Sequence, residues 1–385
     1  MKEFIRNKVR GGLVTENRVT FDIAVASDIM GVEDIFVKKG VKLFGVGGAV
    51  SDAVVGKSPK DWDLATDAKP EQVEKMMANA GLKTIPTGKA SGVINVFTDE
   101  DEHEVATFRK DLGSGRRPDS VEFTTIDQDV KRRDLTINAL FFDIDTNEIV
   151  DLVGGISDLK KGIVRTVGQP EDRFGEDRLR ILRAIRFAGR FGSQLEPNVD
   201  VALKKDAGLE GISPERVRDE FLKGVRTTKS VKHFLGLLEK YNLFNWIFNG
   251  LRVNKVFIEE QDPMVLLAFM LRDNDPKELG KTLNKLTYSA VETKAIAFLV
   301  AFQQFDGPEN VHLFKKQHMA SGVTGEQLRK FGKLINFDQK ILDVFADFKL
   351  TVNGQDAMDK MGVKAGPEMG NAIKKMEADN FKALL

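Results

Sequence analysis

The chain has 385 residues, of which 42% are hydrophobic and 30% charged, a composition typical of globular proteins in water. This length exceeds what one hydrophobic core usually supports and predicts roughly two to four modules. The absence of cysteine excludes disulfides and thiolate metal sites, and four scattered histidines do not suggest a histidine metal centre. No apolar run reaches membrane-spanning length, and Glu3 and Glu16 make the basic start unlike an organelle transit peptide. We therefore expect a cytoplasmic protein with no membrane partner.

Basic and acidic residues balance at 58 each, but they are unevenly distributed. Acidic residues are in excess over residues 1–150, and basic residues are in excess over the remainder. An acidic head that binds metal and a mildly basic remainder are compatible with an enzyme that acts on RNA. An imbalance this small is also common in proteins with no RNA partner.

The first 20 residues are irregular and interrupted by glycine, and we interpret them as an N-terminal extension. A partial apolar face predicts a helix over residues 20–39, and a second helix is predicted over residues 71–80. Short apolar runs predict strands at 41–47, 92–97, 103–109 and 138–145. Together these elements predict a head domain with a mixed sheet over residues 21–155.

Strand signals fade from Glu171 onward, and apolar residues then recur with helical spacing. The predicted helices cover residues 171–191, 213–226, 229–241, 263–273 and 288–304, with several more after them. The expected fold class is therefore α+β. The mixed-sheet head is followed by an all-helical neck over residues 156–225 and an all-helical body and tail over residues 226–385.

The most informative segment joins a hydrophobic strand to Gly47-Gly48 and then to two aspartates, Asp61 and Asp63. Residues two apart in an extended segment point to the same side, so both carboxylates can face one ion. Hard oxygen ligands of this kind suit Mg²⁺. The glycines let a phosphate chain approach the backbone N–H groups. Most such aspartate pairs in arbitrary sequences are solvated loop carboxylates.

Strand, glycine pair and aspartate pair together resemble the head-domain signature of the nucleotidyltransferase superfamily, in particular the class II tRNA nucleotidyltransferase (CCA-adding enzyme) and bacterial poly(A) polymerase family. The resemblance covers about residues 35–225. It implies two-metal phosphoryl transfer with Asp61 and Asp63 as magnesium ligands and Glu104 as the third catalytic carboxylate. Glu104 could instead be one more solvated charge beside the acidic stretch 99–102.

The segment RRDLTINAL, residues 132–140, matches the ribose-recognition motif of the same family. Arg132 and Arg133 carry rigid forks of donors that can neutralise phosphate oxygens. Asp134 and Asn138 are one helical turn apart and can reach one ligand together. The competing structural interpretation is a surface arginine pair at a helix start, with Asp134 as a capping residue.

The segment GEDRLRILRAIRFAGRFG, residues 175–192, places Asp177, Arg180 and Arg183 on one face of a predicted helix. The resemblance implies that this motif reads the incoming base, because Arg can donate to cytosine and Asp can accept from the exocyclic amine of cytosine or adenine. Without the motif match, a solvated arginine face would be the more common interpretation. The residues expected to pack inward are Leu179, Leu182, Ile185 and Phe187.

The sequence departs from the family at Ser51, where the common GGxVRD pattern has an arginine that meets the triphosphate. Serine brings one donor and no charge, and Lys57 is a candidate substitute. We still include Gly47, Gly48 and Ser51 among the nucleotide-binding residues. The basic loop 110–121, with Arg116 and Arg117, is predicted to be flexible. The resembled enzymes use this loop to switch from C to A addition, and here it is one or two residues short.

We expect a CCA-adding tRNA nucleotidyltransferase that uses Mg²⁺, with tRNA, CTP and ATP as its partners. A CC-only or A-adding enzyme and a poly(A) polymerase are the nearest alternatives, although no basic C-terminal tail supports the polymerase. An alternative from a different functional class is a non-catalytic RNA-binding protein. A further alternative is a nucleotidyltransferase that modifies a small molecule or a protein. The sequence leaves the oligomeric state open.

Overall fold

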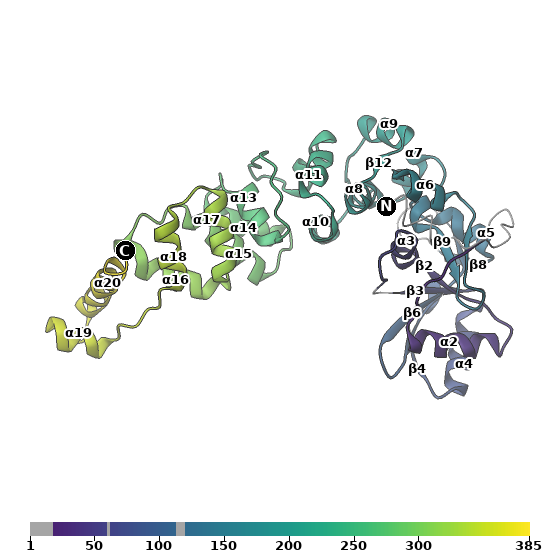
Figure 1. The fold of residues 1–385 in the computed structure, drawn as a ribbon, viewed down its shortest axis with the longest axis horizontal. Helices are drawn as coiled ribbons and strands as arrows, with labels where there is room; N and C mark the ends of the chain where they lie inside the picture. Colours follow the sequence, from purple (N-terminus) through teal and green to yellow (C-terminus); the bar gives the residue numbers. More distant parts are fainter. Residues whose placement is uncertain (1–17, 60–61, 113–119) are drawn as a thin grey trace. The chain divides into compact units, whose positions relative to one another are not determined.

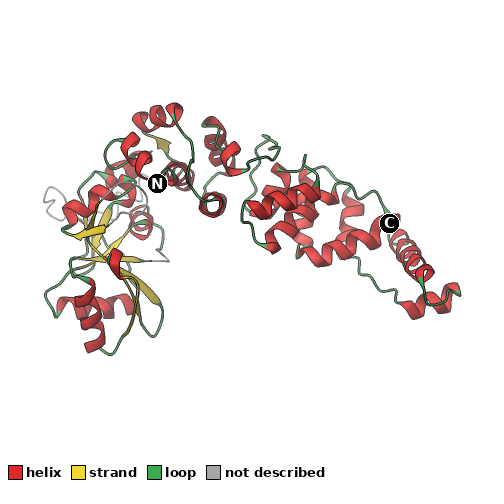
Figure 2. Ribbon diagram, turned by 180° about the vertical axis from the view of Figure 1, so that it is seen from behind, coloured by secondary structure: helices red, strands yellow, loops and turns green. Residues whose placement is uncertain are grey.

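The computed structural model describes residues 18–59, 62–112 and 120–385, which fall into two compact units on either side of the Glu210–Gly211 bond. All strands of the described residues belong to the first unit, and the second is helical (Figure 1; Figure 2, strands in yellow). The α+β fold class is therefore confirmed. The boundary falls inside the segment 156–225 that we predicted as a neck, so the compact units and the predicted domains do not coincide.

The described part of the first unit contains an eight-stranded mixed sheet. Only strands β3 and β6 run parallel, and every other neighbouring pair is antiparallel. The strand order is β1 (Arg18–Thr20), β10 (Glu148–Asp151), β9 (Leu140–Asp143), β2 (Leu43–Val46), β3 (Asp63–Thr66), β6 (Glu102–Thr107), β5 (Val93–Phe97) and β4 (Lys83–Gly88).

The centre of this sheet is apolar on both faces. Every residue of β2 and β9 is buried, which is why these segments read as continuous apolar runs rather than as alternating ones. Phe44, Phe108 and Phe141 pack around one another with ring centroids 5.6–6.3 Å apart. The helices of this region are α2 (Ser27–Val37), α3 (Gly48–Val54), α4 (Pro70–Asn79) and α5 (Ile126–Asp129).

The first unit continues with four helices and a short parallel strand pair. These are α6 (Gly155–Lys161), β11 (Ile163–Val164), α7 (Pro170–Glu176), α8 (Leu179–Phe191), β12 (Gln194–Leu195) and α9 (Pro197–Lys205). Helix α8 buries the apolar face that the sequence predicts, because Leu179, Leu182, Ile185 and Phe187 are all below 9% exposed. The prediction of a single helix over 171–191 is wrong, because residues 177–178 are not helical and separate α7 from α8.

The second unit is a helical assembly with a core rich in phenylalanine. Rings of Phe302, Phe305 and Phe345 lie 4.7–5.5 Å apart between centroids. Helices α13, α14, α15, α17, α18 and α19 each follow an Asp, Ser, Thr or Asn whose side chain accepts from first-turn N–H groups. No helix among the described residues is both long and apolar enough to cross a membrane.

The bounds of the second unit's helices are α10 (Pro214–Thr227), α11 (Val231–Lys240), α12 (Phe244–Ile247), α13 (Pro263–Met270), α14 (Pro276–Lys285), α15 (Ala290–Phe302), α16 (Val311–Ser321), α17 (Gly325–Leu334), α18 (Gln339–Asp347), α19 (Gly354–Met361) and α20 (Pro367–Lys382). The helices predicted at 213–226, 229–241, 263–273 and 288–304 correspond to α10, α11, α13 and α15.

Two expectations for the start of the chain are wrong. The helix predicted over 20–39 begins only at Ser27, and residues 18–20 form strand β1 rather than an irregular extension. Strand β1 pairs with β10, which lies about 130 residues away in the sequence. A three-residue edge strand has no periodic signal of its own, so only this distant partner defines it. The rest of the predicted extension lies outside the described residues.

Helix α2 carries a buried, unpaired carboxyl group at Glu33. The side chain is 3% exposed, and neither carboxylate oxygen has a hydrogen-bond partner. Burial, followed by the charges of Asp143, Asp145 and Asp34, raises the pKa of Glu33 to about 7, against the opposing effect of Lys42. The folded state therefore binds this proton more tightly than the unfolded state, whose Glu33 titrates near 4.5.

We predict that the free energy of unfolding falls as pH rises from about 4.5 to about 7, because ionised Glu33 is destabilising in the folded state. The Glu33 contribution to this fall is about 3 kcal/mol. Glu33→Gln should remove that contribution, and urea unfolding of the first unit at pH 5 and pH 8 measures it. Glu71→Gln, an exposed carboxyl group in the first turn of α4 that does not shift the pKa of Glu33, is the matched control. Parallel pH profiles for wild type and Glu33→Gln would contradict the prediction.

Candidate functional site

The turn after β2 brings a carboxylate against glycine backbone. Val46, the last residue of β2, pairs with Asp63, the first residue of β3. Gly47 follows with φ of +72°, and a Cβ at this position would lie 3.4 Å from Asp63 Oδ2. Glycine meets both demands, the positive φ and the close approach. Helix α3 begins at Gly48, so the start of this helix faces the same carboxylate.

Asp63 and Glu104 lie side by side on the parallel strands β3 and β6. The register pairs Leu64 with Val105, which places the preceding residues, Asp63 and Glu104, next to each other. Both side chains are exposed. Partial desolvation by the surrounding strands and the negative charge of Asp63 raise the pKa of Glu104, against the charge of Arg109. Two like charges at this spacing favour binding of a cation.

The third predicted carboxylate, Asp61, lies outside the described residues, as do Arg116 and Arg117 of the predicted flexible loop. Among the residues that are described, no group of three or more acidic or histidine side chains is placed to hold a metal ion. Strands β7 (Arg109–Leu112) and β8 (Ser120–Phe123) pair on the two sides of the undescribed loop segment.

Trp62 is a structural support of the site that the sequence did not identify. It is 8% exposed, precedes Asp63, and packs against Phe142 with ring centroids 6.0 Å apart. A Cβ on Gly45, in the middle of β2, would lie 2.3 Å from the Trp62 ring. Gly45 therefore leaves the space that the indole fills, and the indole fixes the backbone that carries Asp63.

Asp129 is a second residue that the sequence analysis missed. Its buried carboxylate accepts from Arg132 Nε at 2.8 Å, from Arg133 Nε at 3.1 Å and from the backbone N–H of Arg109 at 3.1 Å. Arg133 also lies over the Phe141 ring, 4.4 Å from its centroid. Neither arginine is the freely solvated surface residue of the competing interpretation. A buried aspartate three or four residues before an arginine pair was the signal available in the sequence.

Asp134 binds an arginine that is 49 residues away in the sequence. Arg183 Nε donates to Asp134 Oδ2 at 2.6 Å, and the backbone N–H of Leu135 donates to Oδ1 at 2.8 Å. Burial alone would raise the pKa of Asp134, but the charge and hydrogen bond of Arg183, with the Leu135 bond and Arg180, hold it below its usual value. Asn138 donates weakly to Asp134, and its buried Oδ1 has no protein partner.

Arg180 ties the start of α8 to the preceding segments. It donates to the carbonyl oxygen of Arg132 at 3.0 Å and pairs with Glu176. Asp177 lies in extended backbone between α7 and α8, and its Oδ1 accepts from the Leu179 N–H at 3.0 Å. The prediction that Asp177 shares a helix face with Arg180 and Arg183 is therefore wrong, because Asp177 precedes the first residue of α8. The aspartate side chain satisfies a first-turn N–H group, which explains why the predicted continuous helix breaks here.

Ser51 does not take the position that we expected for a triphosphate contact. It is fully buried in α3, and its hydroxyl lies within hydrogen-bond distance of the Ile137 carbonyl and, at 3.2 Å, of the Gly47 carbonyl. A hydroxyl has a single proton to donate, and here carbonyl oxygens accept it. Ser51 therefore holds α3 against the segment 136–138, and its side chain does not point to solvent.

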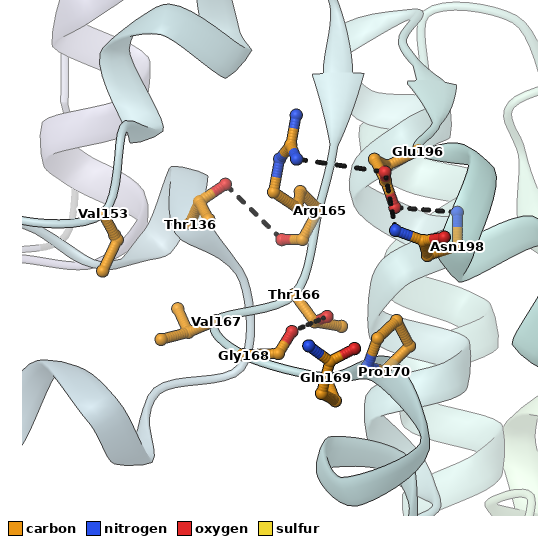
Figure 3. Close-up of a pocket in the computed structure, with 10 residues that line it drawn as sticks. All are labelled: Thr136, Val153, Arg165, Thr166, Val167, Gly168, Gln169, Pro170, Glu196 and Asn198. Atoms are coloured by element: carbon orange, nitrogen blue, oxygen red, sulfur yellow. Dashed lines mark hydrogen bonds and ion pairs between the residues drawn. The ribbon is translucent and has the colours of Figure 1, made fainter.

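A cavity of about 320 Å³ lies near this site but does not include it (Figure 3). None of the predicted site residues lines it. Arg165 lines the cavity, and its guanidinium pairs with Asp158 at 3.1 Å and lies 3.9 Å from Glu196. Glu196 in turn accepts from the N–H groups of Asn198 and Val199 at the start of α9. Arg165 and Glu196 of the cavity wall are therefore each bound by protein groups.

Comparisons with known proteins agree with this geometry. A family model for the poly(A) polymerase head domain matches residues 43–165, and a model described as a probable RNA and SrmB-binding site of polymerase A matches residues 192–254. The CCA-adding enzyme of Lactobacillus helveticus is 41% identical over 366 residues, 88% of each chain. A mitochondrial CCA tRNA nucleotidyltransferase of Danio rerio is 32% identical over 92% of this chain and 87% of its own.

Solved structures show the same similarity. The Bacillus stearothermophilus CCA-adding enzyme in complex with CTP superimposes with a TM-score of 0.73 and 26% identity, over 92% of each chain. The Thermotoga maritima CCA-adding enzyme, solved with a tRNA, shares the fold with a TM-score of 0.65 at 19% identity, over 93% of this chain and 92% of its own.

We predict that Gly45→Ala displaces Trp62, because the new methyl group would overlap the indole. Overpacking of this kind typically costs about 1–3 kcal/mol. The measurements are urea unfolding and tryptophan emission, to which only Trp62 and Trp246 contribute. Gly31→Ala in α2 is the control, since nothing lies within 4 Å of its new Cβ. Unchanged emission and stability in Gly45→Ala would refute the prediction.

We predict that Asp129→Asn lowers the free energy of unfolding by about 3 kcal/mol, because it removes the charge that compensates two partly buried arginines. Asp127→Asn, an exposed carboxylate on the same short helix, should change stability by less than about 0.5 kcal/mol. Denaturant unfolding of the two variants measures the difference. Equal stabilities would show that Asp129 does not anchor the arginines.

Proposed function

Because the chain belongs to the family of CCA-adding enzymes and bacterial poly(A) polymerases, which are nucleotidyltransferases, we propose that it adds C, C and A to the 3′ end of tRNA from CTP and ATP, without a nucleic-acid template. The observation that carries the proposal is the placement of Asp63 beside Glu104 on parallel strands, against the Gly47 turn. We propose the cytoplasm as its location, where tRNA maturation would need it.

The carboxylates of the site fit a divalent metal. Asp63 and Glu104 are exposed, and partial desolvation together with the charge of Asp63 raises the pKa of Glu104, so a cation bound between them would relieve their repulsion. We propose that Asp61, Asp63 and Glu104 hold Mg²⁺, which prefers such hard oxygen ligands. When bound, Mg²⁺ would polarise the attacking hydroxyl and neutralise charge on the triphosphate.

The proposed reaction is an in-line phosphoryl transfer. The 3′-hydroxyl of the tRNA releases its proton to solvent, and its oxygen attacks the α-phosphorus of the incoming nucleotide and forms a new O–P bond. The bond from that phosphorus to the bridging oxygen breaks, and pyrophosphate leaves with the electron pair. The Gly47-Gly48 turn lets the phosphate chain approach backbone N–H groups, since no Cβ stands in the way.

The arginine and amide groups of residues 132–138 would position the nucleotide. Asp129 holds Arg132 and Arg133 in fixed orientations, which lowers the entropy that they lose on binding phosphate. We propose that Asp134 and Asn138 bind the ribose, and the unpartnered Asn138 Oδ1 supplies an acceptor for a ribose hydroxyl.

Base selection is proposed for the α7–α8 junction. Arg180 and Arg183 are oriented by Glu176 and Asp134, and a guanidinium can donate to acceptor atoms of a base. Asp177 offers a carboxylate oxygen to an exocyclic amine, which CTP and ATP share. The RNA-binding family model at residues 192–254 supports tRNA as the partner.

The function is tested with tRNA transcripts that lack all three, the last two or only the last of the terminal nucleotides, incubated with CTP, ATP or both and Mg²⁺. We expect extension to the full CCA end only when both nucleotides are present. Arrest after CC would identify a CC-adding enzyme, and long A tails on any RNA would identify a poly(A) polymerase. Either outcome would overturn CCA addition.

Asp63→Asn and Glu104→Gln should each lower the rate of C addition by about 10³-fold or more, because a lost metal ligand removes several kcal/mol of transition-state stabilisation. Glu71→Gln, an exposed carboxylate in the first turn of α4, is the matched control and should keep wild-type activity. Retained tRNA binding with lost catalysis would exclude a non-catalytic RNA-binding role for the wild type. Full activity of Asp63→Asn would refute the assignment of the site.

A further inference from the structure

The glycine turn of the proposed phosphate site lacks a cation of its own. Helix α3, which follows the turn, contains no basic residue, since its sequence is GAVSDAV. Ser51, where the resembled pattern has arginine, is buried against backbone carbonyls. A triphosphate carries several negative charges, and backbone N–H groups supply only partial positive charge.

A cation reaches this turn from a different part of the chain. Arg190, in the last turn of α8, forms an ion pair with Asp52 of α3, although the two residues are 138 positions apart. Arg190 Nη2 points to the carboxylate, and Nη1 lies 3.8 Å from the position that a Cβ on Gly48 would occupy. Its side chain is 21% exposed, so the guanidinium reaches solvent.

The carboxylate side of the site lies at the neighbouring residue. A Cβ on Gly47 would lie 3.4 Å from Asp63 Oδ2, and Gly47 and Gly48 are consecutive residues, whose Cα atoms are about 3.8 Å apart. The carboxylate proposed to bind metal therefore lies next to the first glycine of the turn, and the Arg190 guanidinium lies next to the second. A phosphate chain that follows this turn would lie between a metal ion and an arginine.

Helix α8 also sets the distance from this cation to the residues proposed for ribose and base. Arg183 and Arg190 are seven residues apart, two helical turns, so they share one face and are separated by about 10 Å along the axis. Arg183 binds Asp134 at one end, and Arg190 lies at the glycine turn at the other. This spacing is comparable with the length of a nucleoside triphosphate.

We propose that Arg190 binds the triphosphate of the incoming nucleotide and supplies, from α8, the positive charge that Ser51 does not provide in α3. Asp52 acts as a positioning residue that directs Nη2 and leaves Nη1 on the side of the glycine turn. The competing role is purely structural, with the ion pair joining α8 to α3. The proposal rests on the proposed function, because it assigns a role within the same nucleotide site.

The test compares the affinities of cytidine, CMP, CDP and CTP, measured by calorimetry with Mg²⁺ and without tRNA. Arg190→Met keeps the apolar stem and removes the charge. We expect it to weaken CTP binding about tenfold or more, the effect of losing a charged hydrogen bond, and to leave cytidine and CMP within about twofold. Arg190→Lys, which keeps a point charge, should be intermediate.

Arg178→Met is the matched control, because Arg178 lies at the start of the same helix and pairs with Asp206 at 2.6 Å. It should leave all four affinities unchanged. Asp52→Asn should lower the melting temperature and weaken CTP binding by less than Arg190→Met does, since the guanidinium remains but loses the carboxylate that positions it. An equal loss for cytidine and CTP in Arg190→Met, or the same loss in Asp52→Asn, would establish the structural role and overturn the proposal.

Lys57→Met tests the alternative cation, whose Nζ lies 5.7 Å from the centre of the Phe191 ring. A larger loss of CTP affinity in Lys57→Met than in Arg190→Met would assign the contact to Lys57 and overturn the proposal. The failure of the proposed function is recognised separately. In that case wild-type protein does not extend tRNA, whatever the dependence of CTP binding on Arg190.

Discussion

The polar face of helix α8 is the constraint on which the candidate site depends. Three of its arginines bind two separate parts of the first unit: Arg180 and Arg183 bind the carbonyl of Arg132 and the carboxylate of Asp134 in one segment, and Arg190 binds the carboxylate of Asp52 in α3. The opposite face is apolar and buried, so burial supplies the stability and the arginines fix how the helix is oriented. Partly exposed ion pairs contribute only modestly to the free energy of unfolding, but these pairs form in one orientation of α8.

The first unit carries an exposed acidic pair and a set of arginines that are bound to other carboxylates. Asp63 and Glu104 form an exposed acidic pair on two parallel strands, and partial burial together with the charge of Asp63 raises the pKa of Glu104. The arginines that face this region are each oriented by a carboxylate, Asp129 being buried for that purpose. A ligand that brings both a metal ion and phosphate groups satisfies the two sets together, which is the charge pattern of a metal–nucleoside triphosphate.

The two units owe their form to different physical signals. The sheet of the first unit depends on pairing between distant segments, so each strand needs a partner that lies elsewhere in the chain. The helices of the second unit form from local signals, namely apolar periodicity and capping side chains such as Asp262 and Ser289. This difference explains why the bounds of α10, α11, α13 and α15 were predicted within a few residues, whereas the strands β1, β4, β7, β8 and β10 were not predicted.

The sequence by itself determined the chemistry of the site, because residue types at fixed local spacing carry it. The spacing of Asp61 and Asp63 is local and the ribose motif is contiguous, whereas the adjacency of Asp63 and Glu104 depends on the register between strands β3 and β6. Only the tertiary structure decided which side chains bind one another: the burial of Ser51, the role of Asp129 and the contact of Arg190 with the glycine turn. A side chain's partner depends on packing between segments up to 138 residues apart, and local spacing does not contain that information.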